Sequence, residues 1–355
     1  MSCALQPVDE ACAPCAPTAS ESSSLDLTLR ALRPLLANPQ VTELCINRPL
    51  EVFIETQAGW QREALPFADF DWCMRFAKLI AHSTRQKVDE TSPLLSASLP
   101  SGERVQIVLP PATTPGCVSI TLRRPSAAVW SIGELAERGV FERTTRSGTA
   151  VEPQEQQLLD LLSAGRFETF LREAVRLRKN ILVSGPTGSG KTTLTKALIR
   201  EIPSDERLIC IEDAKELVLD GHANHVRLYY SKDDQGLARV APKQLLESCM
   251  RMKPDRILLS ELRAEEAFEY LRNVNSGHPG SITSIHASSA ELAFEQLTLL
   301  VKQSRGGAEL SRRDIKNLLY LLVDVVVQFS VERHQRVIKE IWYEPARKRR
   351  TAVRH

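Results

Sequence analysis

The sequence predicts a protein of two domains, a smaller α+β domain followed by an α/β domain with a buried, largely parallel sheet. Its 355 residues exceed the roughly 100–200 residues of a single domain. In the second half, short apolar runs alternate with helix-compatible stretches, which is typical of a parallel sheet covered by helices. A glycine-rich segment at 185–190 joins one such run, Ile181-Leu182-Val183, to a helix-compatible stretch that begins at Leu194.

The first domain is predicted over residues 25–135, after a tail. Residues 1–24 are rich in Ala, Pro and Ser and poor in bulky apolar side chains, so we expect them to be disordered. Helical spacing of apolar residues predicts two helices, and alternation of apolar and polar residues predicts four strands. The helices are expected at 25–36 and 70–83, and the strands at 41–47, 52–55, 104–109 and 117–123.

A polar linker is predicted over residues 136–165, and the second domain over residues 166–346. Within and just after the linker, residues 156–162 and 167–178 have helical spacing. A basic tail, 347–355, follows the last predicted strand, and a run of this kind is usually a solvated face. Apolar runs predict strands of the second domain at 180–184, 207–212, 225–228 and 257–260.

Composition argues against several classes of protein. The chain has 46 Lys and Arg against 44 Asp and Glu, a balance that disfavours a dedicated nucleic-acid or membrane module. Its longest apolar run, Leu318 to Val327, contains Asp324 and falls short of the roughly 20 residues that span a bilayer. The N-terminus lacks the pattern of a secretory signal. Scattered cysteines fit a reduced cytosolic compartment, and the pair Cys12 and Cys15 lacks the second ligand pair of a zinc site.

The glycine-rich segment has the parts of a phosphate-binding loop in the required order. Glycines let the backbone close around a polyphosphate so that successive N–H groups point inward, and the N-terminus of the next helix adds its positive dipole end. Lys191 is placed to reach the β- and γ-phosphates, and the Thr192 hydroxyl to ligate Mg²⁺. The sequence therefore predicts binding of a nucleoside triphosphate with Mg²⁺. The predicted nucleotide-binding residues are Gly185, Pro186, Thr187, Gly188, Ser189, Gly190, Lys191, Thr192 and Thr193.

Acidic residues follow two other predicted strands. Glu212 and Asp213 end one strand, where ligands bind in open α/β sheets, so they are candidates to hold Mg²⁺ or to orient the attacking water. The alternative is that Asp213 caps the following helix together with Glu216. Glu261 ends the strand 257–260 and is the candidate to polarise the attacking water or to act as the base.

Two histidines, His278 and His286, flank a Ser/Thr-rich strand that leads into a helix. A single histidine here would more often be structural. The pair suggests a metal site, but it lacks the Cys or acidic partner that zinc ligation needs. We therefore predict that His286, which ends the strand near the proposed nucleotide, senses the γ-phosphate.

Four segments in this order resemble the Walker A, Asp, Walker B and His boxes of the secretion ATPases. Within that superfamily the chain is most similar to the traffic ATPases of type IV secretion (the VirB-eleven type), over roughly residues 25–346. Segments 41–49 and 340–345 resemble the start of the family's N-terminal domain and its last strand. The four boxes are Gly185–Thr193, Ile211–Leu217, Ile257–Arg263 and Gly277–Ala287.

The resemblance implies a RecA-like P-loop NTPase domain in a homohexamer, with nucleotide between the two domains of each subunit. It also implies that Arg104 and Arg123 approach the phosphates from the N-terminal domain. An arginine there would neutralise charge in the transition state. For the neighbouring Arg124, a solvated position at the strand end is an equal alternative.

The function implied is Mg²⁺-dependent ATP hydrolysis that powers type IV secretion, conjugative DNA or protein transfer, and pilus biogenesis. The implied location is the cytoplasmic side of a Gram-negative inner membrane, with peripheral association through other secretion components, including other secretion ATPases. The basic tail is expected to contribute little, at about 1 kcal/mol per basic residue near an anionic surface. No sequence-specific binding of nucleic acid is expected.

Three alternatives remain at this point. A type II secretion or type IV pilus ATPase of the assembly branch would usually carry a tetra-cysteine zinc module, whereas the second domain has only Cys210 and Cys249. A RecA-type nucleic-acid motor is disfavoured by the balanced charge. A regulatory nucleotide binder without turnover is disfavoured by the presence of Lys191, Thr192 and Glu261.

Overall fold

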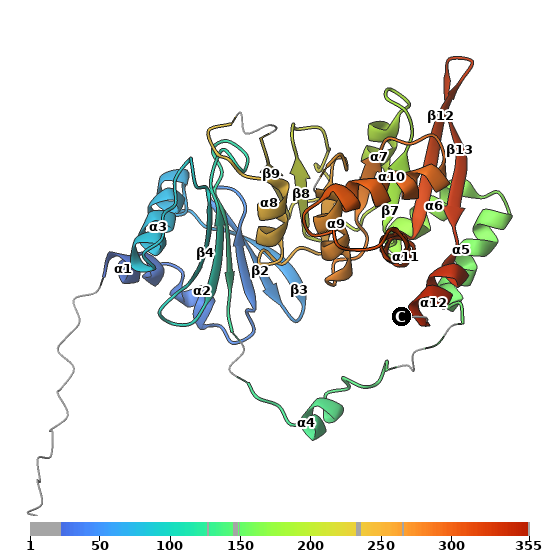
Figure 1. Ribbon diagram of the computed structural model, residues 1–355. Helices are drawn as coiled ribbons and strands as arrows, with labels where there is room; N and C mark the ends of the chain where they lie inside the picture. The colour runs from blue at the N-terminus through green and yellow to red at the C-terminus, as the bar shows by residue number, and fades with distance from the viewer. Residues whose placement is uncertain are drawn as a thin grey trace, which may run out of the picture.

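The computed structural model has the two-domain α/β architecture predicted from the sequence (Figure 1). It describes residues 23–353 apart from 126–127, 145–147, 149, 232–235 and 265. The predicted tail, with Cys12 and Cys15, lies outside these residues except at its last two positions. No helix in the part of the chain that the structure describes is long and apolar enough to cross a membrane.

The N-terminal domain is one six-stranded antiparallel sheet in the order β3-β2-β1-β6-β5-β4, with its helices packed beside it. Its core lies between the sheet and α3, where Phe76 and Ile80 are fully buried against strand residues such as Ile107 and Ile120. The elements are α1 (Ser24–Arg30), α2 (Arg33–Ala37), β1 (Glu43–Ile46), β2 (Glu51–Thr56), β3 (Gly59–Ala64), α3 (Phe70–Ser83), β4 (Leu94–Ser98), β5 (Arg104–Val108) and β6 (Ser119–Arg123).

Two features of this domain differ from the sequence prediction. The helix expected at 25–36 is divided into α1 and α2, with Pro34 in the first turn of α2, because proline lacks the N–H that a continuous helix requires. Strands β3 and β4 were not predicted. They are the two edges of the sheet, and the mostly exposed residues of β3 give little apolar alternation.

The C-terminal domain is built on parallel strands, with the order β10-β8-β9 in one group and β11-β7-β12-β13 in the other. The groups meet where Ser281 and Ser284 donate to the backbone oxygens of Ile257 and Ser260 at 2.7 and 2.9 Å. All these strands are parallel except β13, so their carboxyl ends share one edge. The strands are β7 (Ile181–Ser184), β8 (Leu208–Glu212), β9 (His225–Tyr229), β10 (Arg256–Leu259), β11 (Ile282–Ile285), β12 (Val325–Glu332) and β13 (Gln335–Tyr343).

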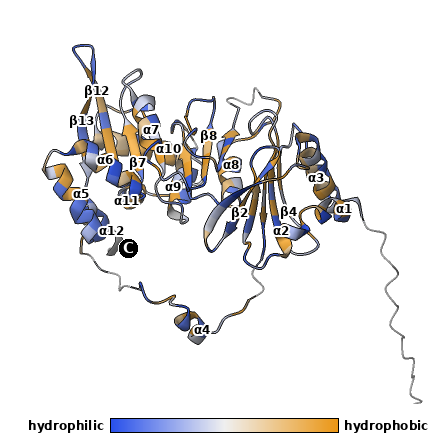
Figure 2. Cartoon of the chain, turned by 180° about the vertical axis from the view of Figure 1, so that it is seen from behind, coloured by the Kyte–Doolittle hydropathy of each residue, from blue (hydrophilic) through white to orange (hydrophobic). Residues whose placement is uncertain are grey.

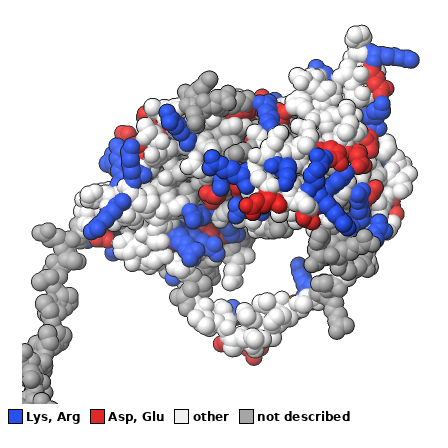
Figure 3. All heavy atoms as spheres, in the orientation of Figure 1, with Lys and Arg blue, Asp and Glu red and all other residues white. Residues whose placement is uncertain are grey.

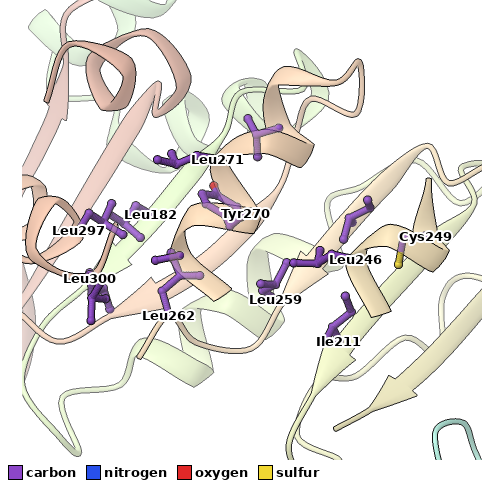
Figure 4. Packing of buried hydrophobic residues seen from close by; sticks show 14 of the residues in the cluster. Leu182, Ile211, Leu246, Cys249, Leu259, Leu262, Tyr270, Leu271, Leu297 and Leu300 are labelled. Atoms are coloured by element: carbon purple, nitrogen blue, oxygen red, sulfur yellow. The ribbon is translucent and has the colours of Figure 1, made fainter. Parts of the chain in front are cut away.

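Helices cover both faces of this sheet, so the side chains of a strand such as β7 point alternately into two apolar cores. Leu182 packs into one apolar cluster, whereas Ile181 and Val183 pack into the other, as alternation along a strand requires. Figure 4 shows the first cluster, in which Leu182, Tyr270 and Leu297 lie together. Figure 2 shows β7 and β8 as hydrophobic strands. The helices are α7 (Lys191–Ile199), α8 (Pro242–Cys249), α9 (Glu266–Asn275), α10 (Ala290–Gln303) and α11 (Arg312–Leu322).

The segment between the domains contains helices α4 (Ile132–Glu137) and α5 (Pro153–Ser163), followed by α6 (Phe167–Arg176). Helix α4 stands apart from both domains in Figure 1, whereas α5 and α6 pack on the C-terminal domain. The helical spacing seen at 156–162 therefore corresponds to α5. The sequence places this helix in the predicted linker, and the structure places its Leu158 in the core of the C-terminal domain.

Part of the basic tail lies in a helix, α12 (Pro345–Val353). Three of its cations contact the C-terminal domain or α5. Arg347 lies 3.6 Å from the centre of the Tyr320 ring, Lys348 pairs with Asp324 at 2.7 Å, and Arg349 donates to Glu155 at 3.2 Å. The three positive charges are therefore part of the packed fold.

The two domains make direct contact along β9. Thr113 of the N-terminal domain pairs with Leu228 in an antiparallel bridge, and its hydroxyl donates to the Arg227 carbonyl at 2.8 Å. At the amino end of β9, the fully buried Arg207 donates to the side-chain oxygen of Asn47 at 2.8 Å. Val108 belongs to the same apolar cluster as Leu228. The domain interface therefore combines apolar packing with buried hydrogen bonds.

Candidate active site

The phosphate-binding segment forms a tight loop between the carboxyl end of β7 and the first turn of α7. Gly185, Gly188 and Gly190 all have positive φ, at 155°, 74° and 105°. A Cβ at Gly185 would lie 2.8 Å from the Cβ of Phe329, so this position also requires glycine for space. The loop thus has the backbone that the sequence predicted, with Thr192 exposed on the first turn of the helix.

Lys191 lies against the loop itself. Its ammonium donates to the carbonyl oxygens of Gly185 and Pro186 at 2.9 and 3.1 Å, and it lies 3.2 Å from Nδ1 of His286. Burial lowers the pKa of Lys191, while the charge of Glu261 acts in the opposite direction. The lysine is therefore held at the loop with two of the residues predicted for catalysis beside it.

Glu261 and His286 meet at the carboxyl edge of the sheet, as the sequence predicted from their strands. Nε2 of His286, the first residue after β11, lies 2.7 Å from Oε1 of Glu261, which follows β10. Arg263 donates to the other carboxylate oxygen of Glu261, which raises the pKa of Arg263. The same guanidinium lies 3.4 Å from Asp213. Lys191, His286, Glu261, Arg263 and Asp213 therefore form one connected charged cluster beside the loop.

Arg263 is the member of this cluster to which the sequence analysis gave no role. It stands two residues after Glu261, in the turn before α9, where its backbone N–H donates to Glu266. A charged residue in the turn that follows an acidic strand end is the only signal for it in the sequence. Its function of joining two carboxylates depends on tertiary structure.

Glu212, by contrast, is directed into the protein. It is fully buried, and its carboxylate accepts the backbone N–H groups of Glu216 and Leu217 at 2.9 and 2.7 Å. Arg227 donates to its second oxygen at 2.8 Å. Its full burial and these contacts place Glu212 as an anchor for the turn after β8 and for β9, and not among the residues at the loop.

Asp213 and Thr192 have the donor atoms that Mg²⁺ prefers, a carboxylate and a hydroxyl oxygen. Thr192 is exposed beside the loop, and Asp213 joins Glu261 through Arg263. Among the described residues no group of three His, Cys, Asp or Glu side chains is spaced to hold a metal by itself. Mg²⁺ that accompanies a nucleotide is usually held by one or two carboxylates together with phosphate oxygens.

Arg104 and Arg123 lie elsewhere. They face each other on β5 and β6 and line a cavity of about 560 Å³ that Arg124 and Lys253 also line. Lys253 precedes β10, whereas Glu261 follows it, so this cavity lies toward the amino edge of the sheet and the phosphate loop lies at the carboxyl edge. Within one chain the structure therefore does not bring the two arginines together with the loop.

The fold and the site together define a phosphate-loop ATPase: a parallel sheet ends in a glycine-rich loop whose lysine lies beside an acid and a histidine. A family model described as "Type II/IV secretion system protein" matches residues 28–333, and the chain belongs to this family. It is 46% identical over 339 residues to the type IV secretion system protein VirB11 of Brucella suis, covering 94% of each chain. It is 41% identical over 327 residues to PtlH of Bordetella pertussis, covering 90% of this chain and 95% of that one.

A solved structure agrees with these sequence matches. The crystal structure of the VirB11 ATPase from the Brucella suis type IV secretion system, in complex with sulphate, has a TM-score of 0.87 and 46% identity to this chain. The match covers 92% of this chain and all of that one. The predicted resemblance to the traffic ATPases of type IV secretion is therefore confirmed, across both domains.

Proposed function

We propose that this chain is a Mg²⁺-dependent ATPase whose homohexameric ring powers type IV secretion, including transfer of DNA or protein and pilus biogenesis. The observation that carries the proposal is the convergence of Lys191, Glu261 and His286 on the phosphate loop. It is supported by the similarity to VirB11 over nearly the whole chain.

The residues at and beside the loop have different roles in the reaction. The backbone N–H groups of residues 185–190 bind the phosphates, and Lys191 leaves the two loop carbonyls to contact the β- and γ-phosphates. Thr192 and Asp213 would hold Mg²⁺, directly or through water, and the ion would neutralise charge on the phosphate oxygens. Glu261 orients and deprotonates the attacking water, because its carboxylate lies at the loop.

His286 links the phosphate-binding lysine to the candidate base, because one of its ring nitrogens lies near Lys191 and the other near Glu261. A lysine that moves to the γ-phosphate would change both contacts. We therefore assign His286 the role of reporting whether the γ-phosphate is present.

Arg104 and Arg123 act on the nucleotide of a neighbouring subunit in this proposal. Their cavity lies toward the amino edge of the sheet of their own chain, away from its own phosphate loop. Arginine side chains stabilise transition-state charge when another subunit supplies them, so a ring accommodates this placement. The proposal modifies the expectation that each nucleotide lies between the two domains of one chain.

Mixing two inactive variants tests the ring. Lys191→Gln has a defective phosphate loop but keeps both arginines. Arg123→Ala keeps the phosphate loop but lacks one of the two arginines. Each alone is expected to lose ATPase activity, and their mixture to regain a measurable fraction, because some loops then face intact arginines. Native mass with and without Mg-ATP gives the number of subunits. If mixtures that form hexamers regain no ATPase activity, the proposed action of Arg123 between subunits is contradicted.

The proposed location is the cytoplasmic side of a Gram-negative inner membrane, through protein partners. Lys348 and Arg349 of the basic tail are engaged in ion pairs within the fold, so these two charges are less available to lipid. On the face drawn in Figure 3, basic and acidic side chains are interspersed, which gives no large surface of one charge. Membrane flotation of the purified protein with and without residues 347–355 tests this. Binding to anionic vesicles that depends on the tail would contradict it.

A further inference from the structure

The cavity of the two arginines contains a buried acid that the reaction described above does not use. Glu43 is the first residue of β1 and is only 3% exposed. In the register of the sheet it is paired with Arg123 on one side and with Glu55 on the other, and Arg123 is paired in turn with Arg104. Two acids and two arginines thus form one row across four strands.

The two oxygens of Glu43 have different surroundings. Oε1 lies 3.5 Å from Nε of Arg123, and Oε2 is buried with no hydrogen-bond partner among the described residues. Glu55 is already engaged, because it accepts from Lys253 at 2.8 Å and from Thr42 at 3.0 Å. Arg123 is therefore the counterion of Glu43. The Arg123 side chain is itself exposed, so burial does not fix its orientation.

We propose that Glu43 is a positioning residue that directs the Arg123 guanidinium toward the cavity, and that it does so only when its carboxylate is ionised. This proposal rests on the proposed action of Arg123 in ATP hydrolysis. A long, 62% exposed arginine side chain has many rotamers, and an ion pair at its Nε restricts them while leaving the terminal N–H groups free for a phosphate.

The charge of Glu43 depends on pH near neutrality. The pKa of Glu43 is raised to about 7, chiefly by burial and also by the neighbouring Glu55, and the charges of Arg123, Lys253 and Arg207 oppose this shift. Arg104 also lines the cavity. As pH falls through this value the carboxylate is protonated, and the ion pair with Arg123 is lost. Arg123 is therefore expected to contribute to turnover fully above pH 7 and progressively less below it.

A double-mutant cycle measured against pH separates this effect from the pH dependence of the rest of the reaction. We would measure kcat and KM of the wild type, Glu43→Gln, Arg123→Ala and the double variant from pH 6 to 8.5. The ratio of wild-type to Arg123→Ala kcat should be large at pH 8 and fall by up to about 10-fold by pH 6, as the ionised fraction of a carboxylate with a pKa of about 7 does. In the Glu43→Gln background the same ratio should be small and independent of pH. Misplacement of a catalytic group by about 1 Å costs up to roughly 100-fold, so Glu43→Gln should lower kcat by about 10- to 100-fold.

Controls keep the outcomes distinct. Glu55→Gln removes the neighbouring acid, and the pH dependence of the Arg123 contribution should persist. Gln is isosteric with Glu, and thermal unfolding checks that each variant folds. An Arg123 contribution that stays constant with pH, or is unchanged by Glu43→Gln, would overturn the positioning role. If Arg123→Ala has no effect at any pH, the proposed role of Arg123 is itself overturned, and this role of Glu43 with it.

Discussion

Exchanging each of the two candidate catalytic acids for its amide separates their roles. Glu261 lies at the loop, 2.7 Å from His286, whereas Glu212 is fully buried and its contacts are with the turn after β8 and with Arg227 of β9. Loss of a general base or water-orienting group costs about 10²- to 10⁴-fold in rate, or about 3–5 kcal/mol of activation free energy. Glu261→Gln should therefore lower kcat by that factor while ATP still binds, because no loop N–H group is altered.

Glu212→Gln should act mainly on stability. The amide retains an acceptor for the turn but leaves the buried guanidinium of Arg227 without its counterion. Breaking one side of a buried ion pair costs about 3–5 kcal/mol. In a domain of this size, that lowers Tm by roughly 10 °C.

Three measurements on both variants decide between the roles: phosphate release at saturating ATP, the Kd of a fluorescent nucleotide, and Tm. The assignment predicts a kinetic defect with nearly unchanged Tm for Glu261→Gln, and a lower Tm for Glu212→Gln. The reasoning fails if Glu212→Gln keeps the wild-type Tm and loses turnover while Glu261→Gln keeps more than a tenth of the wild-type kcat.

Other changes test the loop and the core. Lys191→Gln should abolish steady-state ATPase activity, and unchanged phosphate release would remove the site assignment. Gly185→Ala should reduce both nucleotide affinity and Tm, because its Cβ would overlap an aromatic neighbour; Gly188→Ala is the matched control, since its Cβ would meet no atom within 4 Å and only its positive φ is strained. Glu206→Gln should lower the free energy of unfolding by about 3–5 kcal/mol in a denaturant titration, because it leaves the fully buried Arg256 unpaired. A smaller change than about 1 kcal/mol would show that water or the nearby carbonyls replace the lost carboxylate.

The sequence was sufficient for features that depend on local chain geometry. The phosphate loop requires glycines, a lysine and a hydroxyl at fixed spacing, so its backbone could be predicted from residues 185–193 alone. Glu261 and His286 each follow an apolar strand, and parallel strands bring their carboxyl ends to one edge. Their proximity to Lys191 follows from the same rule.

Features that depend on packing between distant segments were not predictable in this way. Glu212 and Asp213 are adjacent in sequence, yet one carboxylate is buried against Arg227 and the other reaches Arg263. Only the fold of the turn after β8 decides which residue faces the site. The position of Arg123 depends on how the domains pack, about which a strand pattern contains no information.

The interface between the two domains of one chain limits how the proposed ring of subunits could move. Arg207 is fully buried and donates to Asn47 across the interface, and Val108 is buried in the apolar cluster of β9. Separation of the domains would remove both the hydrogen bond and the apolar burial, and such losses usually cost several kcal/mol together. Glu212 further ties the turn after β8, next to Asp213, to Arg227, whose carbonyl accepts from Thr113. In the proposed ring, the two domains of one chain would then move as a unit, and nucleotide-driven motion would fall at contacts between neighbouring chains, where the proposed arginines would act.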